Sequence, residues 1–154
     1  MSPMIQTWLT ARGLTFRLHG HEALKSFEEL SAALNFPPEA MVKTLAFMDP
    51  AGRCILAAMP GAAKADYKRI ADAAGIARSQ LRAATPAELG ETLDAEAGGV
   101  GPFPLAGSQL LIDRSVEALA RIYCGTGRVG STLEIDGAAY LAAAAGIIGD
   151  FAKR

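Results

Sequence analysis

Two apolar runs in the first half of the chain constrain its fold more than any other feature. Val42 to Met48 and Cys54 to Met59 have the length and apolar content of buried strands. The segment Asp49-Pro50-Ala51-Gly52 between them consists of residues that favour turns. We therefore expect an antiparallel hairpin, and hence a sheet that the remaining segments flank.

Helix signals stand on both sides of this hairpin. Ile5, Trp8 and Leu9 share one apolar face of a first helix. Residues that can cap a helix begin four further periodic segments: Ser26, Asp66, Thr85 and Asp136. Further strands are expected at 14–19, 110–112, 120–124 and 132–135. The pattern predicts one α+β domain over residues 1–154, with a mixed, mostly antiparallel sheet flanked by helices.

Composition excludes several classes of protein. The chain has 154 residues, and alanine inflates its 51% hydrophobic content without giving a run long enough to span a membrane. No basic start with an apolar core precedes the first helix, so we expect a cytoplasmic protein. Cys54 and Cys124 lie in apolar strand-like runs and are expected to be buried thiols. With two histidines and no close cysteine pair, no metal site is expected.

The formal net charge of −1 argues against gripping nucleic acid by bulk electrostatics. Charge is nevertheless uneven along the chain. Between residues 64 and 82 five basic residues outnumber two acidic ones, and four acidic residues without a basic partner follow between 88 and 96. Two interpretations stay open: ordinary solvated helix faces, or a weak docking face for a polyanion.

Two segments carry candidate chemistry. Lys43 stands at the start of an apolar strand, where its charge must reach solvent or an anion, although a lysine that extends from a sheet edge into water fits equally. Ala97 to Pro104 holds three glycines and two prolines, which no helix or central strand tolerates. Its backbone N–H groups could bind a carbonyl or carboxylate, or the segment is a plain connecting turn.

Other catalytic arrangements find little support. Gly125-Thr126-Gly127 forms a tight turn but lacks the glycine fingerprint and following helix of a dinucleotide site. Neither histidine stands in a nucleophile-elbow motif, and both cysteines lie in strands. A hydrolase with this sequence would work with few ionisable side chains.

The order of the motifs resembles the YbaK and prolyl-tRNA synthetase editing-domain family from about His21 to the last helix. The motifs are, in order, Val42-Lys43-Thr44-Leu45, Pro60-Gly61 with Asp66 and Lys68, Gly98-xxx-Pro102-Phe103, Ile112-Asp113 and Gly125-Thr126-Gly127. The resemblance implies an α+β domain that hydrolyses the ester between a wrong amino acid and tRNA, typically tRNA for proline. It implies no cofactor and no metal, and it makes the acceptor end of mischarged tRNA the partner, with prolyl-tRNA synthetase as a further candidate partner.

The resemblance also assigns roles to residues. Lys43 would hold the phosphate region of the terminal adenosine, and the loop would orient and polarise the ester carbonyl. The candidate catalytic residues are therefore Lys43, Gly98, Gly99, Val100, Gly101 and Pro102. A positioned water and the ribose hydroxyl of the tRNA would replace a protein nucleophile. The loop departs from the family pattern at Gly101, where relatives commonly carry serine or threonine, and at Pro104, where glycine is frequent.

A pocket for a small amino acid is the remaining part of the site. Candidate substrate-binding residues are His21, Phe27, Thr44, Met59, Phe103, Asp113 and Gly127. The apolar members of this set fit core packing equally by type. Relatives that act on alanine often have asparagine at the position of Thr44, so alanine stays possible but another small amino acid, cysteine, serine or threonine, is favoured. A non-catalytic module that binds aminoacyl-tRNA or a synthetase is the alternative function, and a small-molecule esterase is disfavoured because no nucleophile elbow is present.

Overall fold

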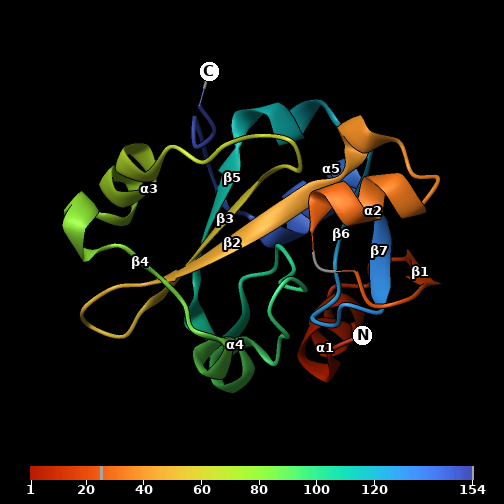
Figure 1. Ribbon diagram of the computed structural model, residues 1–154, viewed down its shortest axis with the longest axis horizontal. Coiled ribbons are helices and arrows are strands. Elements are labelled where there is room, and N and C mark those ends of the chain that lie inside the picture. Colours follow the sequence, from red (N-terminus) through yellow and green to blue (C-terminus); the bar gives the residue numbers. More distant parts are fainter. Residues whose placement is uncertain (25, 154) are drawn as a thin grey trace.

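The computed structural model describes residues 1–24 and 26–153, which form two sheets surrounded by helices (Figure 1). The α-helices are α1 (Pro3–Ala11), α2 (Phe27–Ala33), α3 (Tyr67–Ala74), α4 (Pro86–Leu93) and α5 (Gly137–Ala144). The strands are β1 (Phe16–Gly20), β2 (Val42–Met48), β3 (Cys54–Pro60), β4 (Arg82–Ala83), β5 (Gln109–Asp113), β6 (Arg121–Gly125), β7 (Ser131–Asp136) and β8 (Ile147–Gly149). Short 3₁₀ turns η1 to η4 cover Pro38–Ala40, Arg78–Gln80, Leu105–Gly107 and Arg114–Ala118.

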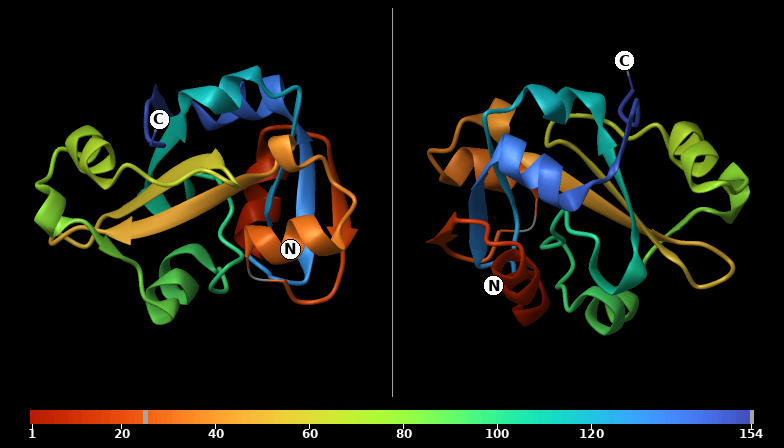
Figure 2. Two further views of the ribbon diagram at one scale, coloured as in Figure 1. Left: turned by 45° about the horizontal axis from the view of Figure 1, so that its top comes forward. Right: turned by 180° about the vertical axis from the view of Figure 1, so that it is seen from behind.

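The strands divide between two sheets. A five-stranded sheet has the order β4-β2-β3-β5-β8, and a three-stranded antiparallel sheet has the order β1-β7-β6. β2 and β3 form the expected antiparallel hairpin, whereas β5 runs parallel to β3 and β8 runs parallel to β5. The α+β class is confirmed, with the difference that two sheets replace the one expected. Figure 1 shows the small sheet at the right of the molecule, and the rear view in Figure 2 shows α5 behind the large sheet.

One edge of β2 is only partly covered. β4 pairs with Phe47 and Met48, and the N–H of Ala84 donates to the carbonyl of Ala46. Residues 42–45 therefore present an edge that no strand of the large sheet covers. An isolated β-bridge between Met41 and Tyr123 links this end of β2 to the small sheet. This junction between the two sheets leaves room for a cavity.

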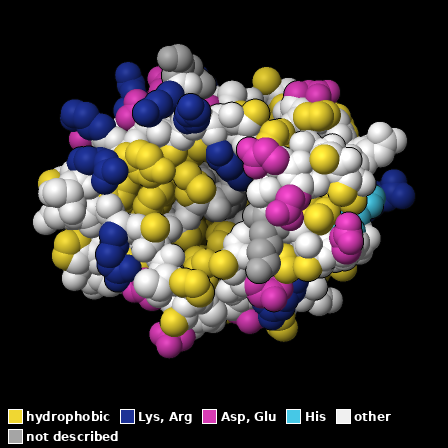
Figure 3. Space-filling view, in the orientation of Figure 1, with side chains coloured by type: hydrophobic (Ala, Val, Ile, Leu, Met, Phe, Trp, Pro, Cys, Tyr) yellow, Lys and Arg dark blue, Asp and Glu magenta, His cyan; other side chains and the backbone are white. Residues whose placement is uncertain are grey.

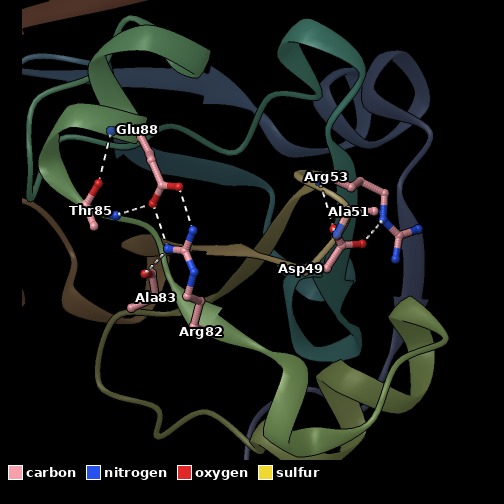
Figure 4. Close-up of polar contacts among 7 residues, drawn as sticks. All are labelled: Asp49, Ala51, Arg53, Arg82, Ala83, Thr85 and Glu88. Atoms are coloured by element: carbon pink, nitrogen blue, oxygen red, sulfur yellow. Dashed lines mark hydrogen bonds and ion pairs between the residues drawn. The ribbon is translucent and has the colours of Figure 1, made fainter.

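All four predicted caps are confirmed. The side chains of Ser26, Asp66, Thr85 and Asp136 each accept a hydrogen bond from the backbone N–H three residues later. At α4 the cap is reciprocal, because Glu88 also accepts from the Thr85 N–H at 2.9 Å (Figure 4). The hairpin turn is closed in the same way by a carboxylate, since Asp49 Oδ1 accepts from the N–H groups of residues 51 and 53 (Figure 4).

The acidic stretch 88–96 is not without basic partners, and that prediction was wrong. Arg82 forms a bidentate ion pair with Glu88, with both N···O distances 2.7 Å (Figure 4). Arg128 pairs with Asp94 at 3.0 Å. The sequence does not show these pairs, because Arg128 is distant along the chain and Arg82 belongs to the basic stretch that ends before the acidic one begins.

Two hydrophobic cores lie on opposite faces of the large sheet. Alternation along β3 directs Leu56 toward the core shared with the small sheet, α1, α4 and α5, and Ile55 toward the core under α3. Cys54 and Cys124 are buried free thiols, as predicted.

Candidate functional site

A cavity of about 280 Å³ lies where the uncovered edge of β2 meets the small sheet. Its walls come from the start of α2, the first residues of β2, the loop at 98–100 and the segment 123–132. Figure 3 shows the front of the molecule hollowed beside α2. The cavity thus collects groups from four regions that are far apart in the sequence.

Lys43 lies in the wall of this cavity and is half-buried. Its Nζ donates a hydrogen bond to the carbonyl of Ala63, in the segment that follows β3. Burial lowers the pKa of Lys43, and the negative charge of Glu28 across the cavity opposes that shift. The cation is therefore held at the wall by a main-chain carbonyl, with Glu28 as an electrostatic partner.

The first half of the glycine-rich loop faces the cavity. Gly98, Gly99 and Val100 line it. The Gly99 N–H donates to the carbonyl of Glu96 at 2.9 Å. The N–H groups of Gly98 and Val100 donate to no acceptor within residues 1–24 and 26–153. These two donors are the main-chain groups that the loop can offer to a ligand.

The second half of the loop is buried and anchors the first half. Gly101 and Pro102 do not line the cavity. The carbonyl of Gly101 accepts from the Phe103 N–H at 2.9 Å, and the carbonyl of Pro102 accepts from the buried Tyr140 hydroxyl at 2.5 Å. Burial also raises the pKa of Tyr140, so that hydroxyl keeps its proton. The structure thus separates the predicted loop into a part that lines the cavity and a part that is buried away from it.

Glycines let the loop pack directly against the turn that follows β6. A Cβ added at Gly125 would lie 2.2 Å from the Val100 carbonyl oxygen and 2.7 Å from that of Gly99. A Cβ at Gly101 would lie 2.5 Å from the Gly125 carbonyl oxygen. The N–H of Gly127 donates to the Gly99 carbonyl at 2.7 Å. No side chain fits between these two backbone segments, so the turn fixes the position of the loop.

An ion pair that sequence reasoning missed braces the same contact. Arg128 lines the cavity, and its guanidinium donates to the Asp94 carbonyl at 2.6 Å and to Asp94 Oδ1 at 3.0 Å. Asp94 also accepts from the Ser2 hydroxyl, and the hydrogen bond from Arg128 is the main reason that its pKa is lowered. The pair joins the segment before the loop to the turn after β6. Its members are 34 residues apart, and no spacing in the sequence points to them.

Three of the predicted substrate-binding residues lie at the cavity or next to it. The ring of Phe27 lines it and lies directly over Gly61, where an added Cβ would be 2.1 Å from the ring. Thr44 lines the cavity, and its buried Oγ1 has no hydrogen-bond partner among the described residues. His21 stands behind the wall, with its Nε2 2.8 Å from Oγ1 of the cavity-lining Thr132.

The other four predicted residues do not line the cavity. Phe103 is buried, with its ring centroid 5.1 Å from that of Trp8. Met59 is buried in the core under α3, because it alternates away from the cavity along β3. Asp113 accepts hydrogen bonds from the N–H groups of residues 151 and 152, at 2.9 Å each, and so holds the C-terminal segment. Gly127, with φ 86°, supports the loop from behind.

Side-chain nucleophiles and metal ligands are scarce in the described part of the chain. Cys124 lines the cavity, but burial raises its pKa far above neutrality, and burial raises that of Cys54 to about 11. Neither cysteine is a thiolate near neutral pH. No group of three or more potential metal ligands occurs within the described ranges. No helix among these residues is long and apolar enough to cross a membrane.

The fold and the cavity define a class of small α+β domain that offers a ligand one lysine and two main-chain donors at the junction of two sheets. A model of the aminoacyl-tRNA editing domain family matches residues 21–143. The chain belongs to that family, and the resemblance found in its sequence is confirmed. A search of curated proteins gave no match.

Solved structures share the fold over nearly the whole chain. "Hypothetical protein APE2540" is 28% identical, with a TM-score of 0.84 over 97% of this chain and 99% of its own. A "putative trans-editing enzyme for prolyl tRNA synthetase" is 21% identical, with a TM-score of 0.84 over 100% of this chain and 99% of its own. A scaffold used for epitope backbone grafting is 18% identical, with a TM-score of 0.83 over the same shares. At such identities the last two show the fold alone.

Proposed function

We propose that this protein is an aminoacyl-tRNA deacylase that hydrolyses the ester of mischarged tRNA in trans. The observation that carries the proposal is the pairing, in one cavity, of Lys43 with two N–H groups, those of Gly98 and Val100, that have no acceptor among the described residues. Membership of the editing-domain family supports it. The proposed reaction takes place in the cytoplasm, where aminoacyl-tRNA is made and used.

The two parts of the site would act on different parts of the substrate. Lys43 binds the phosphate next to the terminal adenosine, and such a charge-assisted contact contributes about 1.5–3 kcal/mol. The Val100 and Gly98 N–H groups bind the ester carbonyl oxygen and stabilise the negative charge that develops on it when water attacks. Loss of one such donor costs on the order of 10²–10³ in rate. The water is oriented by the substrate's own ribose hydroxyl, so no protein nucleophile is required.

The substrate we propose is tRNA for proline that carries a small non-cognate amino acid: alanine, cysteine, serine or threonine. The cavity volume of about 280 Å³ is near the lower limit of ligand sites, which favours a small side chain. One methylene changes selectivity by only about 1–3 kcal/mol, so the cavity selects mainly by excluding larger residues. The description of one similar structure as a trans-editing enzyme for prolyl tRNA synthetase favours the tRNA for proline and that synthetase as a partner.

A deacylation panel tests the proposal. The purified protein is incubated with tRNA for proline carrying each of the four amino acids and with prolyl-tRNA as the control. We expect release of at least one small amino acid above the uncatalysed rate, and little release of proline. Binding of the charged tRNA without turnover would replace the proposal by a non-catalytic binding module.

Replacing Lys43 tests the assignment of the phosphate contact. Lys43→Ala removes one charge-assisted hydrogen bond, so we expect kcat/KM to fall by roughly 10–100-fold. Lys43→Arg keeps the charge and serves as the matched variant. Circular dichroism checks that both variants fold, and full activity of the folded alanine variant would remove Lys43 from the mechanism.

A further inference from the structure

Basic side chains gather on the α3 side of the front face. Figure 3 shows Lys and Arg side chains around that side of the hollow and several acidic side chains around α2. Arg82 does not contribute free charge, because Glu88 neutralises it. Arg69 pairs with Asp66 at 3.5 Å, and the other exposed cations form what we name the basic track: Lys64, Lys68, Arg78 and Lys153.

The basic track begins at the candidate site. Lys43 donates to the carbonyl of Ala63, so Lys64 follows directly after the group that holds Lys43. The carbonyl of Lys64 in turn accepts a hydrogen bond from the N–H of Lys153 at 2.7 Å. Both lysines are exposed. Lys64 and Lys153 therefore extend positive charge from the cavity wall toward α3, where the capping carboxylate of Asp66 precedes Lys68.

The charges of the track are accessible to a polyanion. Lys64 and Lys153 form no ion pair with any residue in the described ranges. Lys68 lies 3.4 Å from Asp72, with both side chains more than 60% exposed, and such pairs contribute little. Arg78 lies over the ring of Tyr67 at 4.7 Å, which fixes its direction without neutralising it.

Acidic side chains gather on the α2 side of the cavity, and one of them, Glu28, lines it. Exposed glutamates begin α2 and flank it at positions 22, 28, 29 and 39. A polyanion that enters the cavity is therefore repelled on the α2 side and attracted on the α3 side. The net charge of −1 does not show this separation, because it sums 15 basic and 16 acidic residues over the whole chain.

We propose that the acceptor stem of the tRNA lies along the basic track, with its phosphates on Lys64, Lys68 and Lys153, while its 3′ end enters the cavity. This inference rests on the proposed function and adds the surface that binds the stem. It assigns to these lysines affinity for the stem and no part in the chemical step. Their effect is confined to substrates that possess a stem.

The test compares two substrates that carry the same amino acid: the full tRNA, and adenosine esterified with that amino acid. Lys64→Glu combined with Lys68→Glu is compared with Arg17→Glu, an exposed charge reversal on β1 at the far side of the molecule (Figure 1). Each phosphate interaction that is removed lowers the slope of log affinity against log salt by about 0.7–0.9. For this double variant we expect kcat/KM on tRNA to fall about tenfold at about 50 mM salt, through an increase in KM. The difference from wild type should become small at about 200 mM salt.

The two substrates separate the possible failures. Unchanged hydrolysis of the adenosine ester by the double variant, together with the loss on tRNA, supports the basic track. Equal loss on both substrates, or tRNA hydrolysis equal to that of the Arg17→Glu control, overturns it. If the wild-type protein hydrolyses neither substrate, the proposed function itself fails. Binding of uncharged tRNA by the same variants then tests the basic track separately, and equal affinity of the double variant and the Arg17→Glu control overturns it.

Discussion

Gly125→Ala is the sharpest perturbation that the structure offers, because its added Cβ meets the backbone of the loop that we propose binds the ester carbonyl and replaces none of the cavity's side chains. The new Cβ would lie 2.2 Å from the Val100 carbonyl oxygen, whereas ordinary contact begins at 3.4 Å. The loop must therefore move by about 1 Å. A displacement of about 1 Å at reacting groups can cost about 10²-fold in rate. We expect kcat to fall by that amount, while KM changes little because Lys43 keeps its place.

Gly130→Ala is the matched control. It lies five residues further along the same turn, and its added Cβ would be 3.5 Å from the nearest atom, the His21 carbonyl oxygen, which is an ordinary contact. Single-turnover deacylation of mischarged tRNA measures the chemical step directly, and thermal unfolding checks that each variant is folded. Crowding at Gly125 also costs about 1–3 kcal/mol of stability. A folded Gly125→Ala protein with wild-type kcat would refute the assignment of the loop to the ester carbonyl.

Glu28→Gln removes the negative charge that opposes the burial-induced fall in the Lys43 pKa, so the alkaline limb of kcat/KM should move to lower pH; a limb that stays in place would contradict this coupling. Tyr140→Phe leaves the Pro102 carbonyl without its donor and should lower the free energy of unfolding by about 1–3 kcal/mol in urea titrations, unlike a surface control. Pairing with a guanidinium lowers the Glu88 pKa to about 2, so this carboxylate stabilises the fold above its unfolded pKa of 4.5 and ceases to do so as pH falls toward 2. The urea midpoint should therefore fall less steeply below about pH 5 in Glu88→Gln than in wild type, and equal slopes would refute the pairing.

Local signals in the sequence predicted local structure well. The β2–β3 hairpin and the four helix caps depend on contacts within a few residues, and all are present in the structure. Such features depend on turn propensity and on side chains that satisfy nearby N–H groups, which a sequence states directly.

Features that depend on distant segments could not be predicted in the same way. The split into two sheets follows from which strands meet, and β1 pairs with β7 more than a hundred residues later. Phe103 and Met59 have the side chains of pocket residues and of core residues alike, and only the packing directs them into the cores. The division of the loop into a half that lines the cavity and a half that is buried likewise depends on distant residues such as Tyr140, which the loop sequence does not contain.

The site's reliance on main-chain groups separates the two candidate functions. A module that only binds an aminoacyl end gains affinity from many interactions, so a shift of the loop by about 1 Å would weaken binding only as far as it breaks the interactions that the loop itself makes. A catalyst depends on interactions that strengthen in the transition state. These interactions weaken steeply when an N–H donor no longer points at the oxygen on which negative charge develops. The close contact of Gly125 with the backbone of residues 99 and 100 holds the loop in position, and Gly125 has no side chain that could contact the ligand. A large loss in kcat with little loss in binding after Gly125→Ala is therefore the behaviour of a deacylase, and matched losses in both are that of a binding module.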